Sequence, residues 1–186
     1  MMITVKDERF TRIRVDFGNI SGYYHPYTGN KECSETMNRK SCFFIGHREA
    51  DERLLPELIA AVEMLITEEQ VSCFYVGGYG GFDRIAASAV KQAKRHHAEI
   101  TLMLILPYHP AERPVETPYG FDGTYYPEGL EQVPRKFAIV KANEIMVNTS
   151  DWLIAYVRHG ASNSRKILEY AQHKGKIKII LIHSEK

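Results

Sequence analysis

Short apolar runs alternate with amphipathic segments from residue 41 onward, and this alternation constrains the fold more than any other feature of the chain. The runs span residues 41–45, 71–76, 100–106, 152–157 and 177–182. The first contains Cys42-Phe43-Phe44-Ile45 without interruption, as expected of a parallel strand that is covered on both faces. Between the runs, apolar residues recur at the spacing of three to four that is typical of helices. The pattern predicts an α/β fold with a doubly wound, mostly parallel sheet of about five strands and helices on both faces.

A loop of small and polar residues follows three of the predicted strands. The loops are Gly46-His47-Arg48, Gly77–Asp83 (with four glycines in five positions) and the turn at Gly160–Ser164, and each precedes a predicted helix. Glycines let backbone N–H groups approach a ligand, and a helix N-terminus adds partial positive charge. If the strand order is 3-2-1-4-5, the three loops converge at the carboxyl ends of the strands, beside the switch point between the first and fourth strands. This convergence predicts a pocket for an anionic or ribose-containing small molecule.

The candidate ligand contacts come from these loops and from one asparagine before the fourth strand: Gly46, His47, Arg48, Gly77, Gly78, Tyr79, Gly80, Gly81, Asp83, Asn143, Gly160, Ser162, Asn163 and Ser164. Most have an alternative structural role. Arg48 suits a phosphate or carboxylate, but it can also pair with Glu49 or Asp51. Asp83 repels phosphate, so it either accepts hydrogen bonds from ribose hydroxyls or caps the following helix. Capping also accounts fully for Ser162, Asn163 and Ser164, and a lone His47 beside a strand end is more often structural than catalytic.

Composition excludes several classes of protein. The net charge of +1, from 24 basic and 23 acidic residues, gives no electrostatic footprint for nucleic acid. The three cysteines (Cys33, Cys42 and Cys73) are too few and too scattered for a disulfide framework, and no metal-binding motif is present. No apolar run approaches the ~18 residues of a membrane span. We therefore expect a cytoplasmic protein that binds neither a metal nor a membrane. The sequence does not decide between a monomer and a homo-oligomer.

The chain divides into two unequal parts. Residues 1–40 are polar, turn-rich and weakly patterned, and we expect them to form an N-terminal appendage. Residues 41–186 are expected to form the single domain. Within it, residues 107–134 interrupt the alternation as a long loop that holds six of the eight prolines and four tyrosines. Loops of this length inside a compact domain are usually functional or disordered, and the tyrosines favour a folded lid over the pocket.

The motifs resemble those of the SLOG superfamily, the Rossmann-like group that includes the cytokinin-activating LOG proteins and the DNA-processing protein DprA. The closest resemblance is to its bacterial YpsA-like branch of uncharacterised proteins. It is carried by Cys42-Phe43-Phe44-Ile45-Gly46-His47-Arg48, by Gly77-Gly78-Tyr79-Gly80-Gly81-Phe82-Asp83, by the stretch from Asn143 to Asp151 before the fourth strand, and by the Gly160–Ser164 turn. The resemblance implies a Rossmann-like domain that binds a nucleotide or a nucleotide-derived ligand, with no settled reaction.

Two departures from the family pattern bear on the activity. LOG enzymes carry a motif resembling P-G-G-x-G-T-x-x-E, whose glutamate supports glycosidic cleavage, whereas residues 160–167 here contain no carboxylate and Glu169 is the nearest. In the YpsA-like branch an arginine often precedes the asparagine of the third motif, and here Ala142 does.

The main hypothesis is therefore a module that binds or senses a nucleotide-type small molecule, with an enzyme that hydrolyses nucleoside phosphates as the less favoured class. The alternatives are a nucleoside-phosphate N-glycosidase, which would use His47, Asp83 or Glu169, and a DprA-like module for nucleic acid or a protein partner, which would use the tyrosines of residues 108–126.

Overall fold

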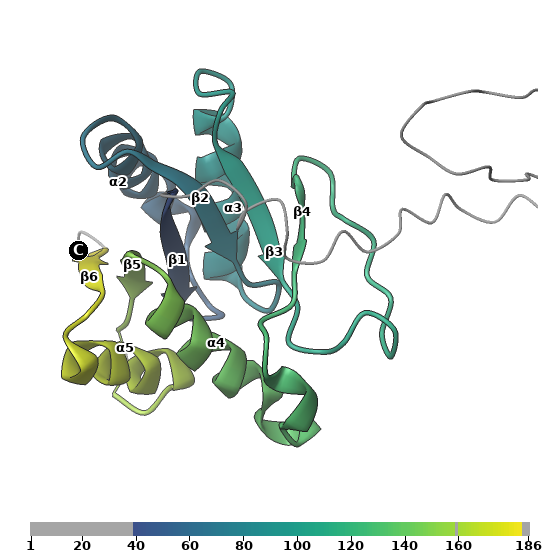
Figure 1. Cartoon of the computed structure of the whole chain (residues 1–186). Coiled ribbons are helices and arrows are strands. Elements are labelled where there is room, and N and C mark those ends of the chain that lie inside the picture. The colour runs from purple at the N-terminus through teal and green to yellow at the C-terminus, as the bar shows by residue number, and fades with distance from the viewer. Residues whose placement is uncertain (1–38, 159, 184–186) are drawn as a thin grey trace, which may run out of the picture.

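The structure, a computed structural model, describes residues 39–158 and 160–183 (Figure 1). The expected N-terminal appendage, residues 1–40, lies almost entirely outside the described residues. The rest folds around one parallel sheet of six strands in the order β4-β3-β2-β1-β5-β6. The strands are β1 (Lys40–Gly46), β2 (Val71–Val76), β3 (Thr101–Ile105), β4 (Gly123–Tyr125), β5 (Trp152–Tyr156) and β6 (Lys178–Leu181).

The sheet confirms the predicted doubly wound α/β fold, with one strand more than the five expected. Every neighbouring pair of strands is parallel, and β1 pairs with β2 on one side and with β5 on the other. The chain therefore moves outward from β1 to β4 and then returns to β5 on the opposite side of β1. The switch point lies between β1 and β5, which are the first and fourth strands of the prediction, so its predicted position is confirmed.

Four helices cover the two faces of the sheet: α2 (Leu55–Thr67) and α3 (Gly81–Ala93) on one face, α4 (Ala138–Thr149) and α5 (Asn163–Lys174) on the other (Figure 1). The buried strand β1 shows how the sequence fills both layers. Phe44 packs in the cluster with α2 and α3, whereas its neighbour Phe43 packs in the cluster with α4 and α5. Successive side chains of a strand point to opposite faces, so a central strand needs apolar residues at every position.

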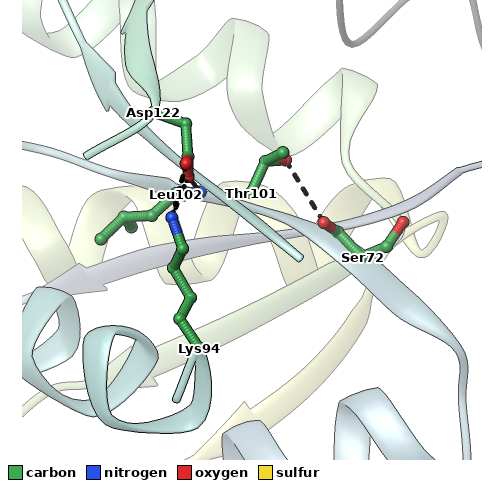
Figure 2. Close-up of polar contacts among 5 residues, drawn as sticks. All are labelled: Ser72, Lys94, Thr101, Leu102 and Asp122. Carbon is green, nitrogen blue, oxygen red and sulfur yellow. Dashed lines mark hydrogen bonds and ion pairs between the residues drawn. The ribbon is translucent and has the colours of Figure 1, made fainter. Parts of the chain in front are cut away.

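The segment 107–134, predicted as one long loop, contains the edge strand β4 and the short 3-10 helix η2 (Leu130–Gln132). A second short 3-10 helix, η3 (Arg135–Phe137), begins just beyond it. Asp122 fixes the start of β4 to the sheet. Its carboxylate accepts a hydrogen bond from the Leu102 backbone N–H (2.7 Å) and pairs with the Lys94 ammonium, as Figure 2 shows. The Asp122 N–H in turn donates to the Leu102 carbonyl at 2.9 Å. These contacts hold a strand of only three residues against β3.

Between β3 and β4, residues 111–119 are all exposed, and the Tyr119 side chain is 98% exposed. A short turn anchors this stretch at its start, because the amides of Glu112 and Arg113 donate to the carbonyl of His109. In Figure 1 the connection extends beyond the edge of the sheet that β4 forms. The segment is therefore folded at both ends and solvated in between.

Candidate functional site

The three predicted loops meet at the carboxyl edge of the sheet and are joined by hydrogen bonds. The side chain of His47 accepts a hydrogen bond at Nε2 from the backbone N–H of Arg158 (2.7 Å). The hydroxyl of Ser164, at the start of α5, donates to the carbonyl of Gly46 (2.7 Å). Both contacts link the loop after β1 to the loop after β5. His47 is 9% exposed and accepts at Nε2, so its position is that of a structural bridge between two loops.

The glycine-rich loop after β2 is attached to the loop after β1 through its own backbone donors. The N–H of Gly81 donates to the carbonyl of Arg48 (2.7 Å), and the N–H of Phe82 donates to the carbonyl of His47 (3.3 Å). A helix N-terminus binds anions through N–H groups of this kind. At the start of α3 these two donors already have protein partners.

Asp83 folds back onto the same loop. Its Oδ2 atom accepts hydrogen bonds from the N–H groups of Tyr79 (2.9 Å) and Gly80 (3.1 Å), which makes it the capping carboxylate of α3. Burial raises the pKa of Asp83 above its ordinary value, and the two backbone hydrogen bonds oppose that rise. The geometry matches the capping role that the sequence left open for Asp83, and the loop's donors at residues 79–82 are satisfied within the protein.

Close packing explains two of the glycines. A Cβ atom at Gly46 would lie 2.3 Å from Cγ of Phe82, and one at Gly81 would lie 2.6 Å from the carbonyl oxygen of Arg48. Neither position tolerates a side chain unless its neighbour moves. The two loops approach each other closely because both lack side chains where they touch. Glycine is therefore needed here for the packing of the loops, in addition to the ligand approach that the sequence suggested.

Arg48 lies at the centre of this junction. Its backbone is held by the Gly81 N–H, while its side chain is exposed and makes no ion pair with any residue that the structure describes. The alternative partner Asp51 is engaged elsewhere, because its carboxylate pairs with Arg53 at 2.9 Å. That pairing lowers the pKa of Asp51 below its ordinary value. The Arg48 guanidinium thus has a fixed attachment point, and no carboxylate of residues 39–158 or 160–183 forms an ion pair with it.

The loop after β5 is organised by helix capping. Ser162 is the N-cap of α5, and its Oγ accepts a hydrogen bond from the N–H of Arg165 (3.1 Å). Asn163 is exposed, and Gly160 has open space around its Cα. Asn143 lies in the middle of α4, half-buried, and no hydrogen bond joins it to the loops in the described ranges. The predicted residues 46–48, 77–83 and 160–164 are therefore brought together, whereas Asn143 is not linked to them.

The sequence predicted the segment after β3 as a lid over the pocket, but none of its residues was among the predicted ligand contacts. Tyr79 is 40% exposed, and partial burial raises its pKa while the nearby charge of Arg113 opposes the rise. Arg113 also lies over the ring of Tyr108, at 6.0 Å from its centroid, and Arg135 lies 5.1 Å from the same centroid. Arg113 and Tyr108 therefore lie close enough to Tyr79 to affect its pKa. The abundance of tyrosine in this segment was the available signal.

A groove of about 240 Å³ has Tyr108 in its lining. Its apolar lining includes Pro107, Leu130 and Val133, and its charged lining comes from Glu112, Glu131 and Arg135. None of the predicted ligand contacts lines it, although Tyr108 and Tyr126 belong to the tyrosines predicted for the DprA-like alternative. The groove lies at the ends of β3 and β4, beside the loops described above.

The comparisons with known proteins assign no family to the chain, so inferences about its function rest on the fold and on the geometry of the site. No protein-family model matches the chain, and no curated protein matches it. Within residues 39–158 and 160–183, no group of three or more His, Cys, Asp or Glu side chains is arranged to hold a metal ion. None of the helices in these ranges is long and apolar enough to cross a membrane.

Proposed function

We propose that this chain binds a nucleotide or nucleotide-derived small molecule at the carboxyl edge of its sheet, where the loops after β1, β2 and β5 meet. The observation that carries the proposal is Arg48. Its main chain is fixed between two glycine-containing loops, and its guanidinium faces solvent without a partner among the described residues. Arginine recognises phosphate and carboxylate groups in a bidentate manner, and a fixed backbone lowers the entropy lost on binding.

Tyr79 supports a ligand that also contains a ring. Its side chain is 40% exposed and lies on the glycine-rich loop whose Gly80 packs against the Cα of Arg48. Exposed aromatic rings offer a stacking face to a base. An arginine and a tyrosine on adjoining loops suit a molecule that joins an anionic group to a planar ring, as a nucleotide does.

Binding or sensing accounts for the site better than hydrolysis. Asp83 uses one carboxylate oxygen to accept two backbone hydrogen bonds, and His47 uses Nε2 to accept one. Glu169, the nearest carboxylate after the last loop, lies on α5 with its Oε1 3.9 Å from Nε of Arg165. The groups that a nucleoside-phosphate N-glycosidase would use as acid or base thus have other partners. On the motifs quoted above, we also propose that the chain is a YpsA-like member of the SLOG superfamily.

A survey of nucleotides by thermal shift and calorimetry tests the proposal. Nucleoside mono-, di- and triphosphates and cyclic dinucleotides are each added to the full chain, and free base is measured in the same samples. A ligand at 100 times its Kd should stabilise the protein by about 2.7 kcal/mol. If no nucleotide binds, the proposal is wrong. Steady release of free base that is lost on changing Glu169 or Asp83 would support the N-glycosidase instead.

A further inference from the structure

The groove at the ends of β3 and β4 has the size of a single ring system. Its volume of about 240 Å³ equals roughly eight water molecules at about 30 Å³ each, which is less than the ~300 Å³ at which pockets for whole drug-sized ligands begin. A fused bicyclic ring fits this space, whereas a whole nucleotide does not. The groove therefore suits one end of a ligand whose remainder lies outside it.

The side walls of the groove suit a flat ring. Arg135 lies over the ring of Tyr108. The rings of His109 and Tyr126 meet edge to face, with their centroids 5.2 Å apart. All four residues belong to the lining. Aromatic and guanidinium faces attract planar heteroaromatic rings, so this lining favours a ring over an aliphatic chain.

The two carboxylates of the lining define the edge that such a ring must present. Glu112 and Glu131 are exposed at the groove and form no ion pair with the described residues. An ionised carboxylate only accepts hydrogen bonds. It therefore favours a ring with N–H donors at its edge, and it disfavours a phosphate at the same place. A guanine-type edge, with a ring N–H next to an exocyclic amino group, offers two adjacent donors.

The groove lies at the same edge of the sheet as Arg48, the residue that binds the anion in the proposed function, but the two are not in contact. Three strand intervals of about 4.8 Å separate β4 from β1, or about 14 Å in all. Tyr79 follows β2, which lies between β1 and β3 in the sheet, and the pKa of Tyr79 is affected by Arg113 and Tyr108. A ligand that reaches both must be longer than a nucleoside monophosphate.

We infer that the groove between Glu112 and Glu131 binds the base of a nucleotide whose ring presents adjacent N–H donors, and that the ligand's phosphates extend toward Arg48. This inference rests on the proposed function and specifies its ligand as a guanine-type nucleoside polyphosphate. The groove supplies recognition of the base, and Arg48 supplies recognition of charge.

Calorimetry with GTP and ITP on the full chain tests the inference, because ITP lacks only the amino group of the base. We expect GTP to bind about tenfold more tightly than ITP. This factor corresponds to the loss of one hydrogen bond to a charged group, taken at the lower end of the energies found for such bonds. The double variant Glu112→Gln/Glu131→Gln should lose this preference. The matched control Glu116→Gln/Glu128→Gln changes two exposed glutamates of the same segment that do not line the groove, and it should keep the preference.

The outcomes separate the inference from the proposed function. If GTP and ITP bind equally, or if the groove variant keeps the preference, the base does not lie in the groove and the inference is wrong. Binding that still depends on Arg48 would leave the proposed function standing in that case. If neither nucleotide nor any other binds, both are wrong.

Discussion

Gly46→Ala should destabilise the protein strongly, because the new methyl group would occupy the space of the Phe82 ring. The added Cβ would lie 2.3 and 2.4 Å from two ring carbons and 2.8 Å from Cβ of Phe82. Ordinary carbon–carbon contacts are about 3.5–4.0 Å, so the ring must retreat by more than about 1 Å. Phe82 is fully buried and stacks on Tyr156 with the ring centroids 5.8 Å apart, which leaves no space for that movement.

The expected magnitude follows from these contacts. Overpacking a core costs about 1–3 kcal/mol, and disturbing an aromatic pair costs a further ~0.5–1.5 kcal/mol. Gly46 does not have a positive φ, so alanine adds no backbone strain. We expect the free energy of unfolding to fall by about 3 kcal/mol. For a domain of this size, the midpoint temperature should then fall by about 6–12 °C.

Urea unfolding of two further variants provides the controls. Gly160→Ala adds a methyl group with no atom within 4 Å, so it should change the free energy of unfolding by less than about 0.5 kcal/mol. In a Phe82→Leu background, Gly46→Ala should cost clearly less than in the wild type, because the clashing ring is gone. A cost for Gly46→Ala as small as that for Gly160→Ala, or one that Phe82→Leu does not reduce, would refute the packing argument.

Four further substitutions test other parts of the structure. Ser164→Ala should lower the free energy of unfolding by about 1 kcal/mol through loss of its bond to the Gly46 carbonyl, whereas Ser150→Ala should raise it by up to about 1 kcal/mol, because the buried Ser150 hydroxyl has no partner among the described residues. Urea unfolding that gave both changes the same sign would contradict this. Burial raises the pKa of Asp83 in the folded protein, so its contribution to stability should fall as the pH rises from 3.8 through the folded-state pKa. Asp83→Asn should therefore gain stability relative to the wild type over that range, and a pH-independent difference would count against a buried carboxylate. Asp122→Ala should release the start of β4 and speed proteolysis within residues 111–119, and an unchanged cleavage rate would show that this anchor is not needed.

The central strands could be predicted from the sequence because burial on both faces leaves a continuous apolar run. Phe43 and Phe44 in β1 show this directly, since each fills a different layer of the core. The short edge strand β4 has no such pattern. It consists of Gly123, Thr124 and Tyr125, all half-buried. It pairs with β3 through its own backbone and is anchored at its start by Asp122, which also pairs with Lys94. Contacts between distant parts of the chain were decisive there, and local patterns do not reveal them.

The candidate site could be located from the sequence, but not the partners of its residues. Glycine loops after parallel strands indicated the correct edge of the sheet, because strand order and crossover direction place such loops together. His47 is held by Arg158, 111 positions away in the sequence, and that separation hides the contact from any local pattern. For Asp83 the sequence left two roles open, binding of ribose hydroxyls and capping of the following helix, and it did not decide between them. The groove depends on side chains from residues 107–138, whose irregular backbone has no periodicity to interpret.

The most direct test of the account compares nucleotide binding by Arg48→Ala and Arg95→Ala. Both arginines are exposed, but Arg95 follows the C-terminal end of α3, at the opposite edge of the sheet. Calorimetric titration should show that Arg48→Ala weakens binding of the best nucleotide by about 1.5–3 kcal/mol, with unfolding in urea unchanged, whereas Arg95→Ala binds as the wild type does. Equal affinity in the wild type and both variants would contradict the central claim that Arg48 holds the charged group of the ligand.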